Sequence, residues 1–233
     1  KIRNLSPSVI VLYAPYGPSW GRHLVYGQES NRVGHERMRK WEEMFPDQLG
    51  AFVYPNSCRE HYNVWPAFRM NYKLYRHLAE KKYKIVAHCG FTPAYAAGAI
   101  SENGSFQALQ MKVLNEVLCD PGVNVEKLVD DYLNDAFGAA AAPMRKYFDL
   151  IQAEPEKRNW GQNTEQIKRG LVTSELAEKA LPLLDEALSL VKTDSEEWKA
   201  VQREIFPFLW SYLTDNCRGN GKITKAQMPF YAK

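Results

Sequence analysis

Three short runs of apolar residues occur in the first part of the chain. Residues 9–14 read Val-Ile-Val-Leu-Tyr-Ala, residues 51–54 read Ala-Phe-Val-Tyr, and residues 84–88 read Lys-Ile-Val-Ala-His. Continuous apolar runs of this length, stopped by prolines or polar loops, are typical of strands that are buried on both faces of a parallel sheet. The pattern therefore predicts three parallel strands.

A helical pattern separates these strands. Residues 35–45 place Met38, Trp41 and Phe45 at spacings of three and four, so that the three side chains share one helix face. Pro66 follows the loop after the second strand. It suits the first position of a helix, where its missing N–H costs nothing. Successive strand–loop–helix units predict a parallel sheet with crossover helices.

Only helical patterns remain beyond residue 105. Ser105 and Asn124 are expected to cap the N-termini of two amphipathic helices, and Gly138 is expected to end the second one. Further helices are expected over residues 139–153, 174–192 and 194–213. Antiparallel packing is the simplest arrangement for the last two.

The predicted strands are too few to close a barrel, because a (β/α)8 barrel has eight. We therefore expect an α/β fold with an incomplete parallel sheet in residues 1–119. Residues 120–233 are expected to form a mostly α-helical C-terminal region. Either the upstream N-terminal barrel strands lie elsewhere in a parent protein, or a neighbouring chain completes the sheet.

Composition and short motifs argue against several functions. The 30 basic and 27 acidic residues are spread along the chain, and no basic cluster indicates a nucleic-acid partner. No apolar run reaches the roughly 18 residues of a membrane span. The sequence has no GxSxG, GxGxxG or P-loop motif, so no nucleotide or other cofactor is expected.

Cysteine and histidine spacings do not indicate a metal site. The four cysteines, Cys58, Cys89, Cys119 and Cys217, form no CxxC pair. The five histidines show no HxxxH or His–Cys spacing, so no bound metal is expected. The cysteines are either free thiols or partners in one or two disulfides.

Several stretches resemble a known bacterial barrel family. Residues 9–16 (VIVLYAPY), Trp41 and residues 51–57 (AFVYPNS) match, in order, the late strands of the family called domain of unknown function 4838. Residues 118–151 (LCDPGVNVEKLVDDYLNDAFGAAAAPMRKYFDLI) are similar to its pattern LxxPxxDVxxLxxxFxxxxYGxAAxxMxxYxxLL. The resemblance extends over residues 5–213 and is most specific in residues 118–151.

This resemblance implies that residues 1–119 form the C-terminal half of a (β/α)8 TIM-like barrel of the glycoside hydrolase type, similar to the α-glucuronidase and hexosaminidase clan. It also implies a secreted or periplasmic location and an oligosaccharide or polysaccharide ligand. The chain departs from the family pattern at the third strand. Where members commonly carry Phe-Glu-Gln-Gly, this sequence has Ala-His-Cys-Gly, so that His88 replaces the acidic residue.

Candidate ligand-binding residues follow from the rule that parallel barrels carry their chemistry at the C-terminal ends of strands and in the loops after them. Aromatic faces can pack on the C–H rims of pyranose rings, while amides and hydroxyls can bind sugar hydroxyls. The rule selects Tyr13, Tyr16, Trp20, Tyr54, Asn56, Tyr62, Trp65 and His88 as substrate-binding residues. The alternative interpretation is that each aromatic side chain only packs its loop onto the sheet.

Catalytic groups are harder to find. Glycoside hydrolysis usually needs two carboxylates, and no Asp or Glu ends any of the three strands. His88 and Glu102 are the weak candidates for a proton-transfer role. The sequence therefore leaves open a glycoside hydrolase-like protein, a non-catalytic glycan-binding module of a polysaccharide-utilisation protein, and a purely structural helical module.

Overall fold

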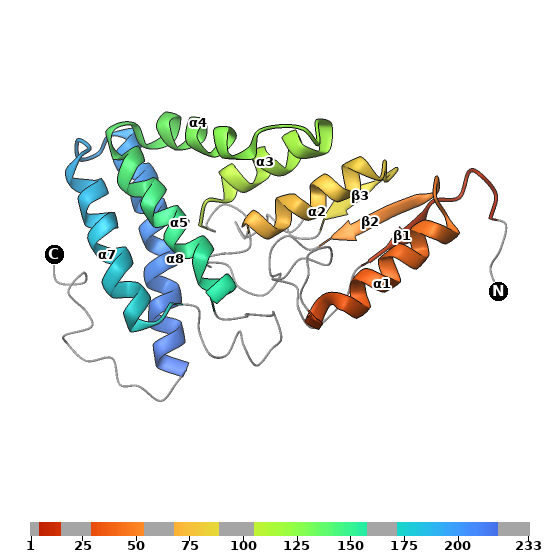
Figure 1. Cartoon of the computed structure of the whole chain (residues 1–233). Coiled ribbons are helices and arrows are strands. Elements are labelled where there is room, and N and C mark those ends of the chain that lie inside the picture. The colour runs from red at the N-terminus through yellow and green to blue at the C-terminus, as the bar shows by residue number, and fades with distance from the viewer. Residues whose placement is uncertain (1–4, 15–28, 54–67, 89–104, 158–171, 219–233) are drawn as a thin grey trace, which may run out of the picture.

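The computed structural model describes residues 5–14, 29–53, 68–88, 105–157 and 172–218. A small sheet with two helices lies at one end of the molecule, and a group of long helices lies at the other (Figure 1). The elements, in chain order, are β1 (Val11–Tyr13), α1 (Glu29–Met44), β2 (Leu49–Val53), α2 (Phe68–Glu80), β3 (Val86–His88), α3 (Gln107–Cys119), α4 (Val125–Phe137), η2 (Gly138–Ala140), α5 (Ala141–Lys157), α7 (Ser174–Ser189) and α8 (Glu196–Arg218).

The predicted parallel sheet is confirmed. The three strands lie in the order β1-β2-β3, and both neighbouring pairs are parallel. Tyr13 is in register with Ala51, and Ala51 is in register with Val86. Strands β1 and β3 are shorter than the apolar runs that predicted them, whereas β2 begins two residues before its run and α1 begins six residues before the predicted start at residue 35.

The two crossover helices cover one face of this sheet. Parallel crossovers are right-handed, and the order β1-β2-β3 steps in one direction, so α1 and α2 lie on the same side. Ala51 faces them and is buried in one core with Met38 of α1 and Tyr75 of α2. The helices therefore bury only one set of alternating strand residues.

Apolar side chains on the opposite face of the sheet are exposed to solvent. Ile10, Leu12 and Ile85 are 42%, 51% and 46% exposed. They surround Gly50, where an added Cβ would lie 3.0 Å from Leu12 Cδ1 and 3.3 Å from Ile10 Cγ2. Parallel sheets are normally covered on both faces, so this degree of exposure is unusual.

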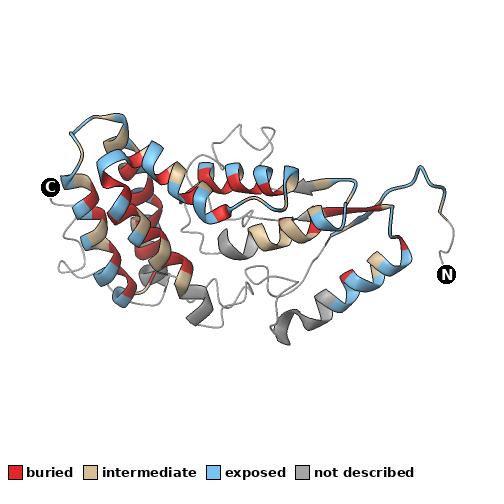
Figure 2. Cartoon of the chain, turned by 45° about the horizontal axis from the view of Figure 1, so that its top comes forward, coloured by how far each residue is buried: buried red, intermediate tan, exposed pale blue. Residues whose placement is uncertain are grey.

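The remaining helices extend the same core away from the sheet. Helix α3 packs against α2 and α4, and α4 contacts α5 and α8. Helices α5, α7 and α8 lie side by side, and α7 and α8 run antiparallel as predicted (Figure 1). Buried positions form stripes that face the interior of this group (Figure 2). One continuous hydrophobic cluster runs from Met38 in α1 to Tyr212 in α8.

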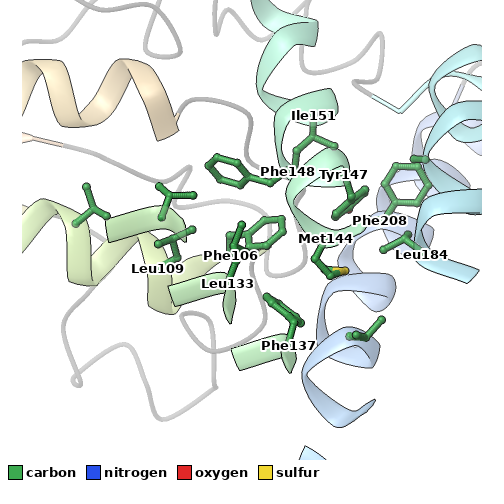
Figure 3. Close-up of a cluster of buried hydrophobic side chains, with 14 of the residues drawn as sticks. Phe106, Leu109, Leu133, Phe137, Met144, Tyr147, Phe148, Ile151, Leu184 and Phe208 are labelled. Atoms are coloured by element: carbon green, nitrogen blue, oxygen red, sulfur yellow. The ribbon is translucent and has the colours of Figure 1, made fainter. Parts of the chain in front are cut away.

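Aromatic residues form the centre of the helical region (Figure 3). The Phe106 ring lies 5.1 Å from that of Phe148 and 5.9 Å from that of Tyr147, and Tyr147 in turn contacts Phe208 of α8 at 5.8 Å. Most of these pairs are edge-to-face, an arrangement that adds to the free energy gained from burial. The start of α3 is thereby packed directly onto α5, which in turn contacts α8 through Tyr147.

Arg145 links α4 to α5 at the surface of this core. Its guanidinium donates to Glu126 and Asp130 of α4 and to Asp149 one turn along α5. These three carboxylates raise the pKa of Arg145. The boundary predicted between residues 119 and 120 falls at the end of α3, and the division into two regions there stays a prediction.

Helix ends agree with the sequence in part. The Asn124 side chain accepts from the Lys127 N–H at 3.1 Å, as an N-cap should. The prediction that Ser105 caps α3 is wrong. The N-cap is Phe106, and no side chain caps it. The Ser105 hydroxyl instead donates a hydrogen bond to the buried carboxylate of Glu204 in α8.

Gly138 ends α4 as predicted and should be sensitive to substitution. Its backbone has φ +51 and ψ −119, which side-chain-bearing residues rarely adopt. We expect Gly138→Ala to lower the free energy of unfolding by about 1–3 kcal/mol, measured by chemical denaturation. Gly122→Ala is the matched control, since Gly122 has no positive φ. A control that destabilises as much would contradict the backbone explanation.

Candidate functional site

The downstream edge of the sheet is where the sequence places a ligand site. Tyr13 is the last residue of β1, and His88 is the last residue of β3. His88 is in register with Val53, two residues beyond the level that Tyr13 shares with Ala51. The backbone positions of Tyr13 and His88 therefore lie at the same edge, as parallel strands require.

The Tyr13 side chain packs on the helix-covered side of the sheet. Its ring lies 6.3 Å from that of Trp41, which stacks on Phe45 at 5.6 Å. Burial raises the pKa of the Tyr13 hydroxyl, and the charge of Arg37 partly opposes the rise. Tyr13 is thus part of the contact between β1 and α1, and its role in binding a ligand stays a prediction.

Most of the predicted site lies outside the described residues. This applies to Tyr16, Trp20, Tyr54, Asn56, Tyr62, Trp65 and Glu102, and to the side chain of His88. The sheet brings the ends of β1, β2 and β3 to one edge, so that the segments after them begin next to each other. How their side chains converge stays a prediction.

A polar cluster that the sequence did not indicate lies between α1 and α2. Glu42 Oε1 accepts a hydrogen bond from His77 Nε2 at 2.8 Å and another from the Tyr83 hydroxyl at 3.1 Å. The Glu42 and His77 side chains are each only 16% exposed. Burial and the nearby Glu42 carboxylate raise the pKa of Tyr83.

This cluster lies at the upstream edge of the sheet. Glu42 is in the last turn of α1, and His77 is in the last turn of α2, where each helix returns to the start of the next strand. In parallel barrels that edge contributes to stability, whereas function lies at the opposite edge. We therefore interpret the cluster as a structural, hydrogen-bonded cross-link that holds α1 against α2. Glu42 and His77 occupy similar positions in successive strand–helix units, near the end of each helix. This correspondence is the sequence feature that could have predicted their contact.

A second buried carboxylate lies in the helical region. Glu204 of α8 accepts from the Ser105 hydroxyl at 2.8 Å and from the Phe106 N–H at 2.9 Å. Burial raises its pKa from the ordinary value of 4.5 to about 7, and the two hydrogen bonds oppose the rise. No sequence pattern selected Glu204, because it lies 98 residues from Phe106 along the chain.

Other chemistry is limited within the parts of the chain that the structure describes. There, no group of three or more His, Cys, Asp or Glu side chains could hold a metal ion. Cys119 is a free, exposed thiol. None of the described helices is both long and apolar enough to cross a membrane.

Comparison with known proteins gives one match. A family model described as "Domain of unknown function (DUF4838)" matches residues 5–149. No curated protein and no solved structure matches the chain. The matched residues include all three strands and helices α1 to α4.

The cross-link between α1 and α2 makes a specific prediction about stability. Glu42→Ala should lower the free energy of unfolding by about 1–3 kcal/mol, because two partly buried donors lose their acceptor. Glu43→Ala is the matched control, since Glu43 is the next residue and is 67% exposed. Chemical denaturation measures both. Equal effects of the two substitutions would show that the cluster contributes nothing.

Proposed function

Because the chain belongs to the DUF4838 family, we propose that it forms late strands of a glycoside hydrolase-like (β/α)8 barrel and binds an oligosaccharide at their downstream ends. The observation that carries the proposal is the sheet itself. Its three strands are parallel and in sequence order, and its helices cover one face only. A barrel wall has the same order and the same one-sided helix layer.

The exposed apolar face supports the barrel part of the proposal. The interior of such a barrel is filled by branched apolar side chains from the strands, and Ile10, Leu12 and Ile85 are residues of that kind. Both β1 and β3 are edge strands in the described sheet and can accept a further strand. On this proposal, upstream barrel strands of the parent protein pair there and bury the face.

The residue types after the strands support a sugar ligand. Tyr54 and Asn56 follow β2, and Tyr62 and Trp65 lie in the same connection before α2. Such residues offer flat apolar surfaces together with hydroxyl and amide groups, which suits a ligand with C–H rims and many hydroxyls. A secreted or periplasmic location, where polysaccharides are met, belongs to the same proposal.

A non-catalytic glycan-binding role is the second candidate, and one residue favours it. His88 ends β3, where the family pattern usually has a glutamate. Hydrolysis by the usual mechanism needs two carboxylates, so a hydrolytic parent protein must supply them from other strands or from Glu102. The two candidates share the binding site and differ only in turnover.

Binding and turnover should be measured on the full-length parent protein, with a glycan array and a panel of aryl glycosides. We expect a glycan ligand whose affinity falls at least about tenfold, or about 1.4 kcal/mol, in Tyr54→Ala and in His88→Ala. These substitutions remove a stacking face and a hydrogen-bonding group at the downstream edge. Isothermal titration calorimetry with the best array ligand gives the affinities.

Tyr83→Phe is the matched control, because Tyr83 lies near the upstream edge and its phenol contacts Glu42. This variant should bind the glycan as well as the wild-type protein does. Binding without turnover would select the non-catalytic role. Full affinity in both Ala variants would remove the site assignment, and the absence of any glycan ligand would overturn the proposal.

A further inference from the structure

Glu204 connects two distant parts of the chain inside the protein. Its carboxylate accepts from the Ser105 hydroxyl at 2.8 Å, and both of its oxygens accept from the Phe106 N–H, at 3.0 and 2.9 Å. Glu204 and Ser105 are both buried. The start of α3 is thus tied to α8 by hydrogen bonds that solvent does not reach.

The residue held by these bonds has a strained backbone. Phe106 adopts φ 50 and ψ 31, the left-handed conformation, which is uncommon for a large aromatic residue. Its ring packs between Phe148 and Phe137, and its N–H is fixed by Glu204. Strain of this kind persists only where the surroundings impose it, so the carboxylate and the aromatic cluster together hold the start of α3.

The charges around Glu204 do not compensate its burial. The titratable groups that interact with it among the described residues are Arg203 on α8, Tyr132 on α4 and Tyr147 on α5. Arg203 is exposed and lowers the pKa of Glu204 only in part. Burial raises the pKa values of Tyr132 and Tyr147, and the Glu204 charge raises them further. The site therefore favours the neutral carboxyl.

Tyr147 provides a further hydrogen-bonding group when the Glu204 carboxyl is neutral. Its hydroxyl is buried and makes no hydrogen bond within standard geometry, although Ser105 is close enough to oppose the rise in its pKa. Ser105 therefore lies within reach of both Glu204 and Tyr147. A hydroxyl can rotate and act as donor or acceptor, so Ser105 can turn from one partner to the other.

We propose that Glu204 takes up a proton from solvent as the protein folds, and that this proton strengthens the attachment of α3 to α8. In the neutral state the carboxyl O–H donates to Ser105 Oγ, the Ser105 proton turns to Tyr147, and the other carboxyl oxygen still accepts from Phe106. No covalent bond changes. The ionised state keeps the two donors, Ser105 and Phe106, but leaves a buried charge.

The direction of the pH effect follows from the two protonation states. The pKa of the Glu204 carboxyl has its ordinary value of 4.5 in the open or unfolded form, and burial raises it to about 7 in the closed form. The closed form therefore binds more protons between these values. Its extra stability is complete below about pH 4.5, is lost as the pH rises toward 7, and does not change further above that. Mild acid should tighten the attachment.

Amide hydrogen exchange of α3, read by mass spectrometry and corrected for intrinsic rates, tests this proposal. In the wild-type chain the opening constant should rise about a hundredfold from pH 4.5 to pH 7. Glu204→Gln keeps an acceptor for Phe106 and cannot ionise, so its opening constant should be independent of pH. Glu178→Gln, on the exposed face of α7, is the matched control and should behave as wild type.

Ser105→Ala separates a proton effect from a merely structural one. Ser105 donates to the ionised carboxylate and, in the proposal, accepts from the neutral carboxyl, so its loss should move the midpoint of the pH dependence. A structural defect would instead lower protection equally at every pH. The ¹³C chemical shift of the Glu204 carboxyl gives the midpoint directly, even where Glu204→Gln does not fold. Titration near 4.5, or equal pH dependence in wild type and Glu204→Gln, would overturn the proposal.

Discussion

Parallel strand pairing is the constraint on which the rest of this structure depends. Each parallel pair needs a crossover of its own, and here α1 and α2 provide the crossovers on one side of the sheet. This arrangement brings the ends of the strands to one edge and places the helix returns, with Glu42 and His77, at the other. Among the described elements, it also leaves the opposite face of the sheet without a helix layer. The proposed site and the proposed barrel both follow from that one-sided geometry.

The helical region is joined to the sheet region by packing and by one buried polar contact. Helix α3 packs against α2 on one side and against α4, which contacts α5 and α8, on the other. A movement of the start of α3 would therefore change the packing of both regions. Phe106 at that start is held by an aromatic cluster, which is insensitive to pH, and by Glu204, which is not. The sheet region and the helical region therefore share one hydrophobic core, while the Glu204 contact between them depends on pH.

The sequence predicted the local features and missed the distant polar contacts. Apolar runs between prolines were enough to predict parallel strands, and Asn124 and Gly138 marked both ends of α4, because these signals arise from neighbouring residues. The contacts Glu42–His77 and Glu204–Ser105 join residues 35 and 99 positions apart. No periodicity reports such pairs. Ser105 was misread for the same reason, since its short-range capping pattern was outweighed by a distant carboxylate.

For the candidate site, the sequence could predict only the edge of the sheet at which it lies, and not how its side chains are oriented. Strand order places Tyr13, at the end of β1, and His88, at the end of β3, at the same edge of the sheet. The orientation of the Tyr13 ring, however, depends on packing partners such as Trp41. In the described sheet, β1 is an edge strand that carries the exposed Leu12 next to Ile10, and such an edge is a template for strands from other molecules. The chain on its own should therefore self-associate as its concentration rises.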